Sequence, residues 1–207
     1  MDLLSSLRLS NMPVSVKLLF TAVLMTLGTG YIFALANVAL KVGFSSEEVA
    51  LKYYGNEPSR QVLRDIERAE SATEEGGAGV VEGEAFSFDS FDEELPVQEE
   101  PIVSIPSLEA LVSEGHFHLF GYTTIFFLCG LILVFAEVPS FLKNTLIIAP
   151  FVASVLDIWS MLLTRFVGPG FAWLLMVSGM VMALSFLMVF VIGIYQLWFL
   201  HPKETAK

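Results

Sequence analysis

Four long apolar runs determine what this chain can fold into. Each reaches the roughly 20 residues that an α-helix needs to cross the hydrocarbon core of a bilayer, and they are Leu18–Leu40, Phe117–Ala136, Thr145–Thr164 and Phe171–Leu200. Hydrophobic residues make up 55% of the chain and the mean hydropathy is +0.68, more apolar than an ordinary soluble domain. We therefore predict an all-α integral membrane protein with four transmembrane helices in a bundle and the lipid bilayer as its first partner.

The last apolar run is long for a single crossing. At 1.5 Å per residue it would reach about 45 Å, so it must tilt, kink or project beyond the hydrocarbon. Gly179 and Gly193 are the candidate kink positions.

The negative charge of the chain is concentrated in the connection between the first two runs. The net charge is −11 overall, yet residues 42–116 hold 18 Asp and Glu against 4 Lys and Arg. Basic residues mark the other three segments that share one side of a four-span topology: Arg8 and Lys17 in residues 1–17, Lys143 before the third run, and Lys203 and Lys207 in residues 201–207. The positive-inside rule then predicts cytoplasmic N- and C-termini and an extracytoplasmic acidic segment, with Arg165 as the exception.

The first run also allows a different interpretation. Ala34-Leu35-Ala36 is similar to a small-x-small signal-peptidase site after an apolar core. The polar lead-in is long and the apolar stretch exceeds a typical signal sequence, which favours an uncleaved helix.

Within the acidic segment, short helices and a disordered stretch are expected. Ser45 and Glu48 form a capping-box pattern that opens a short helix through about Tyr54, and a second polar helix follows Pro58. Residues 69–101 are too polar to offset the entropy of ordering, so we expect them to be disordered. Phe86, Phe88 and Phe91 lie in that stretch, either as a docking motif or in a solvated tether. Ser107 should cap an amphipathic helix on the membrane surface.

Asp157, inside the third run, is the sharpest candidate for a functional residue, because an ionisable group within a span costs a few kcal/mol and faces a bundle interior. Ser154, Asp157, Ser160 and Thr164 follow at steps of three or four, so they form one polar stripe that ends beside Arg165.

Polar residues at a similar depth on other helices can meet this stripe. His118 and Tyr122 share a face of the second helix, and Asn37 lies near the end of the first. The group is either a buried site for a proton, a quinone or an ion, or a hydrogen-bonded network that specifies helix packing.

His116 and His118 raise the question of a metal or a haem. Residues two apart point to opposite sides of a helix, so the pair can bind one metal only in an extended chain. His201 belongs to the opposite membrane side, which excludes a bis-His haem within one subunit and would require another ligand type or another chain.

Several classes of protein are disfavoured. No stretch clusters Lys and Arg as a nucleic-acid site requires, and no hydrolase, P-loop or dinucleotide motif is present. Cys129 is the single cysteine, so no intramolecular disulfide forms. An enzyme is therefore the less favoured class.

Two sequence stretches carry a resemblance. Glu114-Gly115-His116-Phe117-His118-Leu119-Phe120-Gly121, followed later by Phe171-Ala172-Trp173-Leu174-Leu175 and Ser178-Gly179, is similar to a group of small uncharacterised bacterial inner-membrane proteins with His-x-His at the start of a transmembrane helix. The resemblance covers the last three spans and implies a bacterial inner membrane without implying an activity.

Two functional hypotheses follow. The first is a non-catalytic anchor or scaffold subunit of an inner-membrane or envelope complex, which contacts membrane or periplasmic proteins through its acidic segment. A homo-oligomer is a further arrangement open to this subunit. The second is an electron- or proton-transfer subunit with a quinone- or haem-adjacent site around Asp157, His118 and Tyr122.

Overall fold

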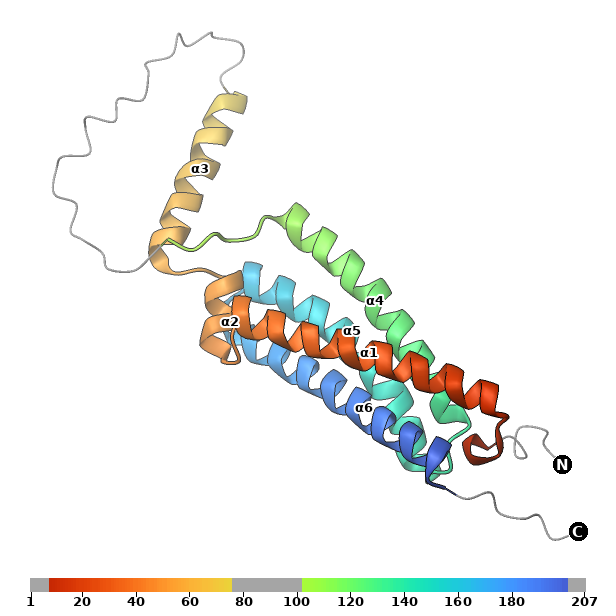
Figure 1. The fold of residues 1–207 in the computed structure, drawn as a ribbon. Helices are drawn as coiled ribbons and strands as arrows, with labels where there is room; N and C mark the ends of the chain where they lie inside the picture. The colour runs from red at the N-terminus through yellow and green to blue at the C-terminus, as the bar shows by residue number, and fades with distance from the viewer. Residues whose placement is uncertain (1–7, 76–101, 201–207) are drawn as a thin grey trace, which may run out of the picture.

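A computed structural model describes residues 8–75 and 102–200, and in these residues the chain is helical and contains no strand. Four helices are long and apolar enough to cross a membrane, which confirms the predicted fold class. Figure 1 shows them side by side as a bundle: α1 (Val14–Lys41), α4 (Leu108–Val134), α5 (Ser140–Phe166) and α6 (Ala172–Trp198). Two shorter helices, α2 (Ser46–Tyr53) and α3 (Glu57–Glu75), follow α1 at one end.

The helix bounds differ from the predicted spans most clearly in α4. The surface helix expected after Ser107 and the span expected over 117–136 are one continuous helix that begins at Leu108. Ser107 does cap it, because its Oγ accepts a hydrogen bond from the backbone N–H of Ala110 at 3.2 Å. The polar first turns carry no helix breaker, so the helix continues from the aqueous side into the bilayer.

Helices α5 and α6 show two further differences. Helix α5 begins at Ser140, directly after Pro139, so Lys143 lies in its first turns rather than in a connection. It also contains Pro150 in its interior. Helix α6 is unbroken through Gly179 and Gly193, and its 27 residues make a shorter helix than the predicted run.

Helix α1 packs at the edge of the bundle against α6. Leu24 is fully buried there, and a Cβ added to Gly193 would lie 2.9 Å from its side chain, so this glycine allows the close approach. Tyr31 stacks on Phe186 with ring centroids 4.8 Å apart. Gly179, by contrast, has nothing within 4 Å of an added Cβ.

Helix α2 covers the end of the bundle that lies opposite to the start of α1. The capping box is present, with Ser45 Oγ accepting from the Glu48 N–H and the Glu48 carboxylate accepting from the Ser45 N–H at 2.9 Å. A second apolar cluster holds α2 on the bundle, and its buried members are Val49, Tyr53, Leu111, Met161 and Ala172.

Helix α3 projects away from the bundle (Figure 1). The turn before it uses Gly55 at a φ of +81°, a conformation that favours glycine. Its base is fixed because Ser59 Oγ accepts a 2.7 Å hydrogen bond from the backbone N–H of Val103. The helix continues to Glu75 and so enters the stretch 69–101 for which we predict disorder. Phe86, Phe88 and Phe91 lie outside the described residues.

The start of α1, the α4–α5 connection and the end of α6 lie at one end of the bundle, and α2 and α3 lie at the other (Figure 1). Arg8, Lys17 and Lys143 are therefore grouped at one end, as the four-span topology requires. His201, Lys203 and Lys207 lie outside the described residues.

Candidate functional site

The carboxylate of Asp157 joins three transmembrane helices. It lies on α5, nine residues before the end of that helix, which places it about 13 Å inside the helix end. Its Oδ1 accepts a 2.8 Å hydrogen bond from Ser178 Oγ on α6, and its Oδ2 accepts a longer one, 3.4 Å, from the Tyr122 hydroxyl on α4. We call Asp157, Tyr122 and Ser178 the carboxylate cluster.

His118 contacts the carboxylate cluster at Tyr122. The two rings stack one helical turn apart on α4, with centroids 5.5 Å apart and an interplanar angle of 9°. His118 itself is exposed on the outer surface of α4. The predicted convergence of the His118–Tyr122 face with Asp157 is therefore found, although Tyr122 makes the contact.

The other hydroxyls of the α5 stripe are buried and donate hydrogen bonds to backbone carbonyls of α5 itself. Ser160 Oγ donates to the backbone carbonyl of Asp157, and Thr164 Oγ1 donates to that of Ser160. Ser154 Oγ donates to the carbonyl of Pro150 at 2.7 Å and lies 3.3 Å from Met182 Sδ on α6. These bonds satisfy hydroxyls in an apolar environment, which is the usual arrangement for serine and threonine in a span.

Two predicted members of the group lie elsewhere. Asn37 is exposed on α1, and the structure shows no hydrogen bond from it to Asp157 within the described residues. Arg165 donates from Nε to the carbonyl of Pro106 at 3.1 Å and lies over the Phe166 ring. Arg165 thus ties the segment before α4 to the end of α5 instead of pairing with Asp157.

Both histidines of His116-Phe117-His118 lie within α4, so the extended conformation that a shared metal requires is not the one found. His116 is exposed and tilts against Phe120, with ring centroids 4.9 Å apart. Among the residues that the structure describes, no group of three or more His, Cys, Asp or Glu side chains is arranged to hold a metal ion.

Sequence reasoning missed Ser178 and Tyr53. Ser178 is 2% exposed and donates the shortest bond that the Asp157 side chain accepts. Its only signal was a hydroxyl within a long apolar run, since a buried polar group in a span needs a partner.

Tyr53 lies above the carboxylate cluster on α2. It is 5% exposed, and its hydroxyl is 3.2 Å from Lys52 Nζ. Lys52 is in turn 4.0 Å from Glu114 on α4. Burial, together with the negative charges of Glu114 and Asp157, raises the pKa of the Tyr53 hydroxyl, so it remains a neutral hydrogen-bonding group.

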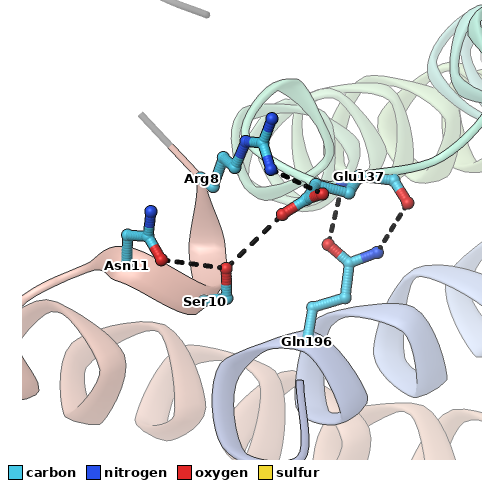
Figure 2. A network of polar contacts seen from close by, with 5 residues as sticks. All are labelled: Arg8, Ser10, Asn11, Glu137 and Gln196. Atoms are coloured by element: carbon cyan, nitrogen blue, oxygen red, sulfur yellow. Dashed lines mark hydrogen bonds and ion pairs between the residues drawn. The ribbon is translucent and has the colours of Figure 1, made fainter. Parts of the chain in front are cut away.

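A second polar network lies at the opposite end of the bundle, shown in Figure 2. The buried side-chain amide of Gln196 on α6 accepts from the Glu137 N–H at 2.7 Å and donates to the Glu137 carbonyl at 3.0 Å. The Glu137 carboxylate pairs with Arg8 at 3.2 Å and accepts from Ser10 at 3.4 Å. This network fixes the segment before α1 to the α4–α5 connection and to α6.

An open apolar groove of about 570 Å³ runs between α5 and α6 on the lipid-facing side. Its wall includes Ser178, so the carboxylate cluster is one hydroxyl away from the bilayer. The remaining lining is apolar except for Asn144 and Thr145, which suits the hydrocarbon chains of the membrane.

Comparison with known proteins gives a family match. The model of the family Aq_1264_TM, described as a transmembrane helical domain, matches residues 43–205. No curated protein and no solved structure matches the chain. The match extends from the turn before α2 past the end of α6, and α1 lies outside it. The chain is therefore a multi-pass membrane protein that belongs to the Aq_1264_TM family of transmembrane helical domains.

Proposed function

We propose that the protein is a non-catalytic membrane scaffold, a subunit that anchors other proteins of a bacterial inner-membrane or envelope complex. The observation that carries the proposal is the pair of hydrogen bonds that the Asp157 carboxylate accepts. Its two oxygens accept hydroxyl hydrogen bonds from two neighbouring helices, so its polar capacity goes into holding α4, α5 and α6 together.

The two ends of the bundle support this proposal. Gln196 and Glu137 lock one end through a buried side-chain–backbone pair. At the other end, α2 is fixed by its own apolar cluster, and α3 extends from it as an arm into the aqueous phase. A rigid bundle that carries an extramembrane arm suits a protein that holds a partner in place.

The proposal includes an orientation. Arg8, Lys17 and Lys143 gather at one end, and α2 and α3, which belong to the acidic segment, lie at the other. By the positive-inside rule, the N- and C-terminal end is cytoplasmic and the α3 arm is periplasmic. Arg165, at the periplasmic end, is held by the Pro106 carbonyl.

One observation favours a second candidate, a proton-transfer subunit. The Tyr122 hydroxyl bonds the Asp157 carboxylate, and the exposed His118 ring stacks on the Tyr122 ring, so two side chains that can take up or release a proton lie on either side of one phenol. A quinone in the adjacent groove would supply redox chemistry to such a subunit.

Asp157→Asn separates the two candidates, because asparagine keeps the size and one acceptor oxygen but cannot ionise. For a scaffold, the variant should elute from gently solubilised native membranes in the same assembly as the wild type. A particle that assembles normally but loses quinol-dependent or proton-coupled activity would favour the second candidate and would contradict the scaffold role.

A further inference from the structure

Helix α3 carries an exposed apolar stripe. Val62, Leu63 and Ile66 fall on one side of the helix at steps of three and four. Val62 is 43% exposed and Ile66 is 50% exposed, whereas Leu63 is half-buried, on a helix that projects from the bundle. Large aliphatic side chains at adjacent positions of an aqueous helix mark an interaction surface.

The arm is presented in a fixed way. Its base is held by the bond between Ser59 Oγ and the Val103 N–H, and by the glycine turn at Gly55. Within the helix, Arg64 pairs with Glu57 at 2.8 Å and Arg68 pairs with Asp65 at 3.5 Å. These exposed pairs add little to the stability of the 19-residue helix. Covering the stripe would therefore stabilise the arm.

The charges beside the stripe select the partner. Asp65 and Glu67 lie on its two flanks by helical spacing, whereas Arg64 and Arg68 lie on the opposite face. Arg60 lies beside Glu67 in this projection, and its guanidinium lies over the Tyr54 ring at the base of the helix, 3.8 Å from the ring centroid. A second copy of α3 packed on the stripe would bring acidic flanks against acidic flanks. An anionic membrane surface would be repelled by the same carboxylates. It would also be repelled by the negative charge of residues 76–101, which carry 8 Asp and Glu and no Lys or Arg.

We propose that the stripe of Val62, Leu63 and Ile66 is the docking surface for an amphipathic helix of another protein, one with aliphatic residues on its apolar face and Lys or Arg on both flanks. Such a helix packs its apolar face on the stripe and pairs its basic flanks with Asp65 and Glu67, as in helix-in-groove recognition. The proposal rests on the scaffold function and names the class of partner that the arm receives.

The test uses the full-length protein in nanodiscs of neutral phosphatidylcholine and two fluorescent helical peptides of identical apolar face. One peptide has lysine at its flanking positions and the other has glutamate. Fluorescence anisotropy should show binding of the lysine peptide and at least tenfold weaker binding of the glutamate peptide. Ile66→Asp should weaken binding of the lysine peptide at least tenfold, although the new aspartate attracts the lysines. Ser71→Asp, which adds the same charge on the opposite face, should leave binding unchanged or strengthen it.

Three outcomes would overturn the proposal. One is equal binding of both peptides, or lysine-peptide binding that survives both Ile66→Asp and the milder Ile66→Ala. Another is oxidation of Ile66→Cys in the membrane to a covalent dimer in high yield, which would assign the stripe to a second copy. The third is stronger protection of the arm by anionic vesicles than by the lysine peptide. A native assembly that persists with Ile66→Asp would leave the scaffold function standing and remove only this surface.

Discussion

Replacing Ser178 by alanine tests whether the carboxylate cluster stabilises the bundle. Ser178→Ala removes the 2.8 Å contact of the hydroxyl with Asp157 Oδ1 and also its 2.8 Å contact with the Leu175 carbonyl of its own helix. It leaves the carboxylate with the 3.4 Å bond from Tyr122. A hydrogen bond contributes about 0.5–1.5 kcal/mol in soluble proteins, and interhelical bonds in membranes contribute about 0.6–1.7 kcal/mol. We expect Ser178→Ala to lower the free energy of unfolding by about 1–2 kcal/mol.

The contribution of the pair is isolated by a double-mutant cycle with Asp157→Ala, measured by reversible unfolding in mixed detergent micelles. The coupling energy of Ser178 and Asp157 should be about 1 kcal/mol or more. That of Tyr122 and Asp157, from Tyr122→Phe, should be below about 0.5 kcal/mol, because a 3.4 Å O–H···O contact is weak.

Ser154→Ala is the matched control. Ser154, on α5, is buried like Ser178, and its hydroxyl likewise bonds a carbonyl of its own helix, that of Pro150, but it makes no hydrogen bond with the Asp157 side chain. A loss of unfolding free energy in Ser178→Ala no larger than in Ser154→Ala, together with a coupling energy between Ser178 and Asp157 of zero within error, would show that the carboxylate cluster does not stabilise the bundle.

Three further changes test other parts of the fold. Gln196→Leu leaves the backbone N–H and C=O of Glu137 without their partner, so thermal unfolding should show a loss of about 2 kcal/mol or more. Gly55→Ala places a Cβ 2.5 Å from Ile105 at a φ of +81°; it should loosen the base of α3 and speed amide exchange there, and unchanged exchange would contradict the strained turn. Hydrogen bonds from the side chain and the backbone of Ser45 lower the pKa of Glu48. The cap therefore stabilises α2 at pH values above the ordinary pKa of a glutamate, and this stabilisation is lost as the pH falls below about 4. Amide exchange in α2 should show that acid-induced loss in the wild type and not in Glu48→Gln.

Features that depend on local sequence could be predicted well. The four spans follow from hydropathy over about 20 residues, and the capping box of α2 follows from the spacing of Ser45 and Glu48. The predicted meeting of Tyr122 with Asp157 followed from helix periodicity and a common depth in the bilayer.

Features that depend on how helices rotate against one another could not be predicted. A serine in an apolar run has no periodic signature, so the bond from Ser178 to Asp157 appears only when α5 and α6 are packed. The Gln196–Glu137 pair joins residues 59 positions apart for the same reason. The continuity of α4 was missed because a change from polar to apolar composition does not end a helix that contains no breaker.

Native mass spectrometry of the protein, released gently from its own membrane, tests the scaffold role most directly. The account predicts a particle that holds the 22.8 kDa chain and a second protein at a fixed ratio, with the same ratio for Asp157→Asn. A particle that contains only this chain, as one copy or several with lipid, would contradict it.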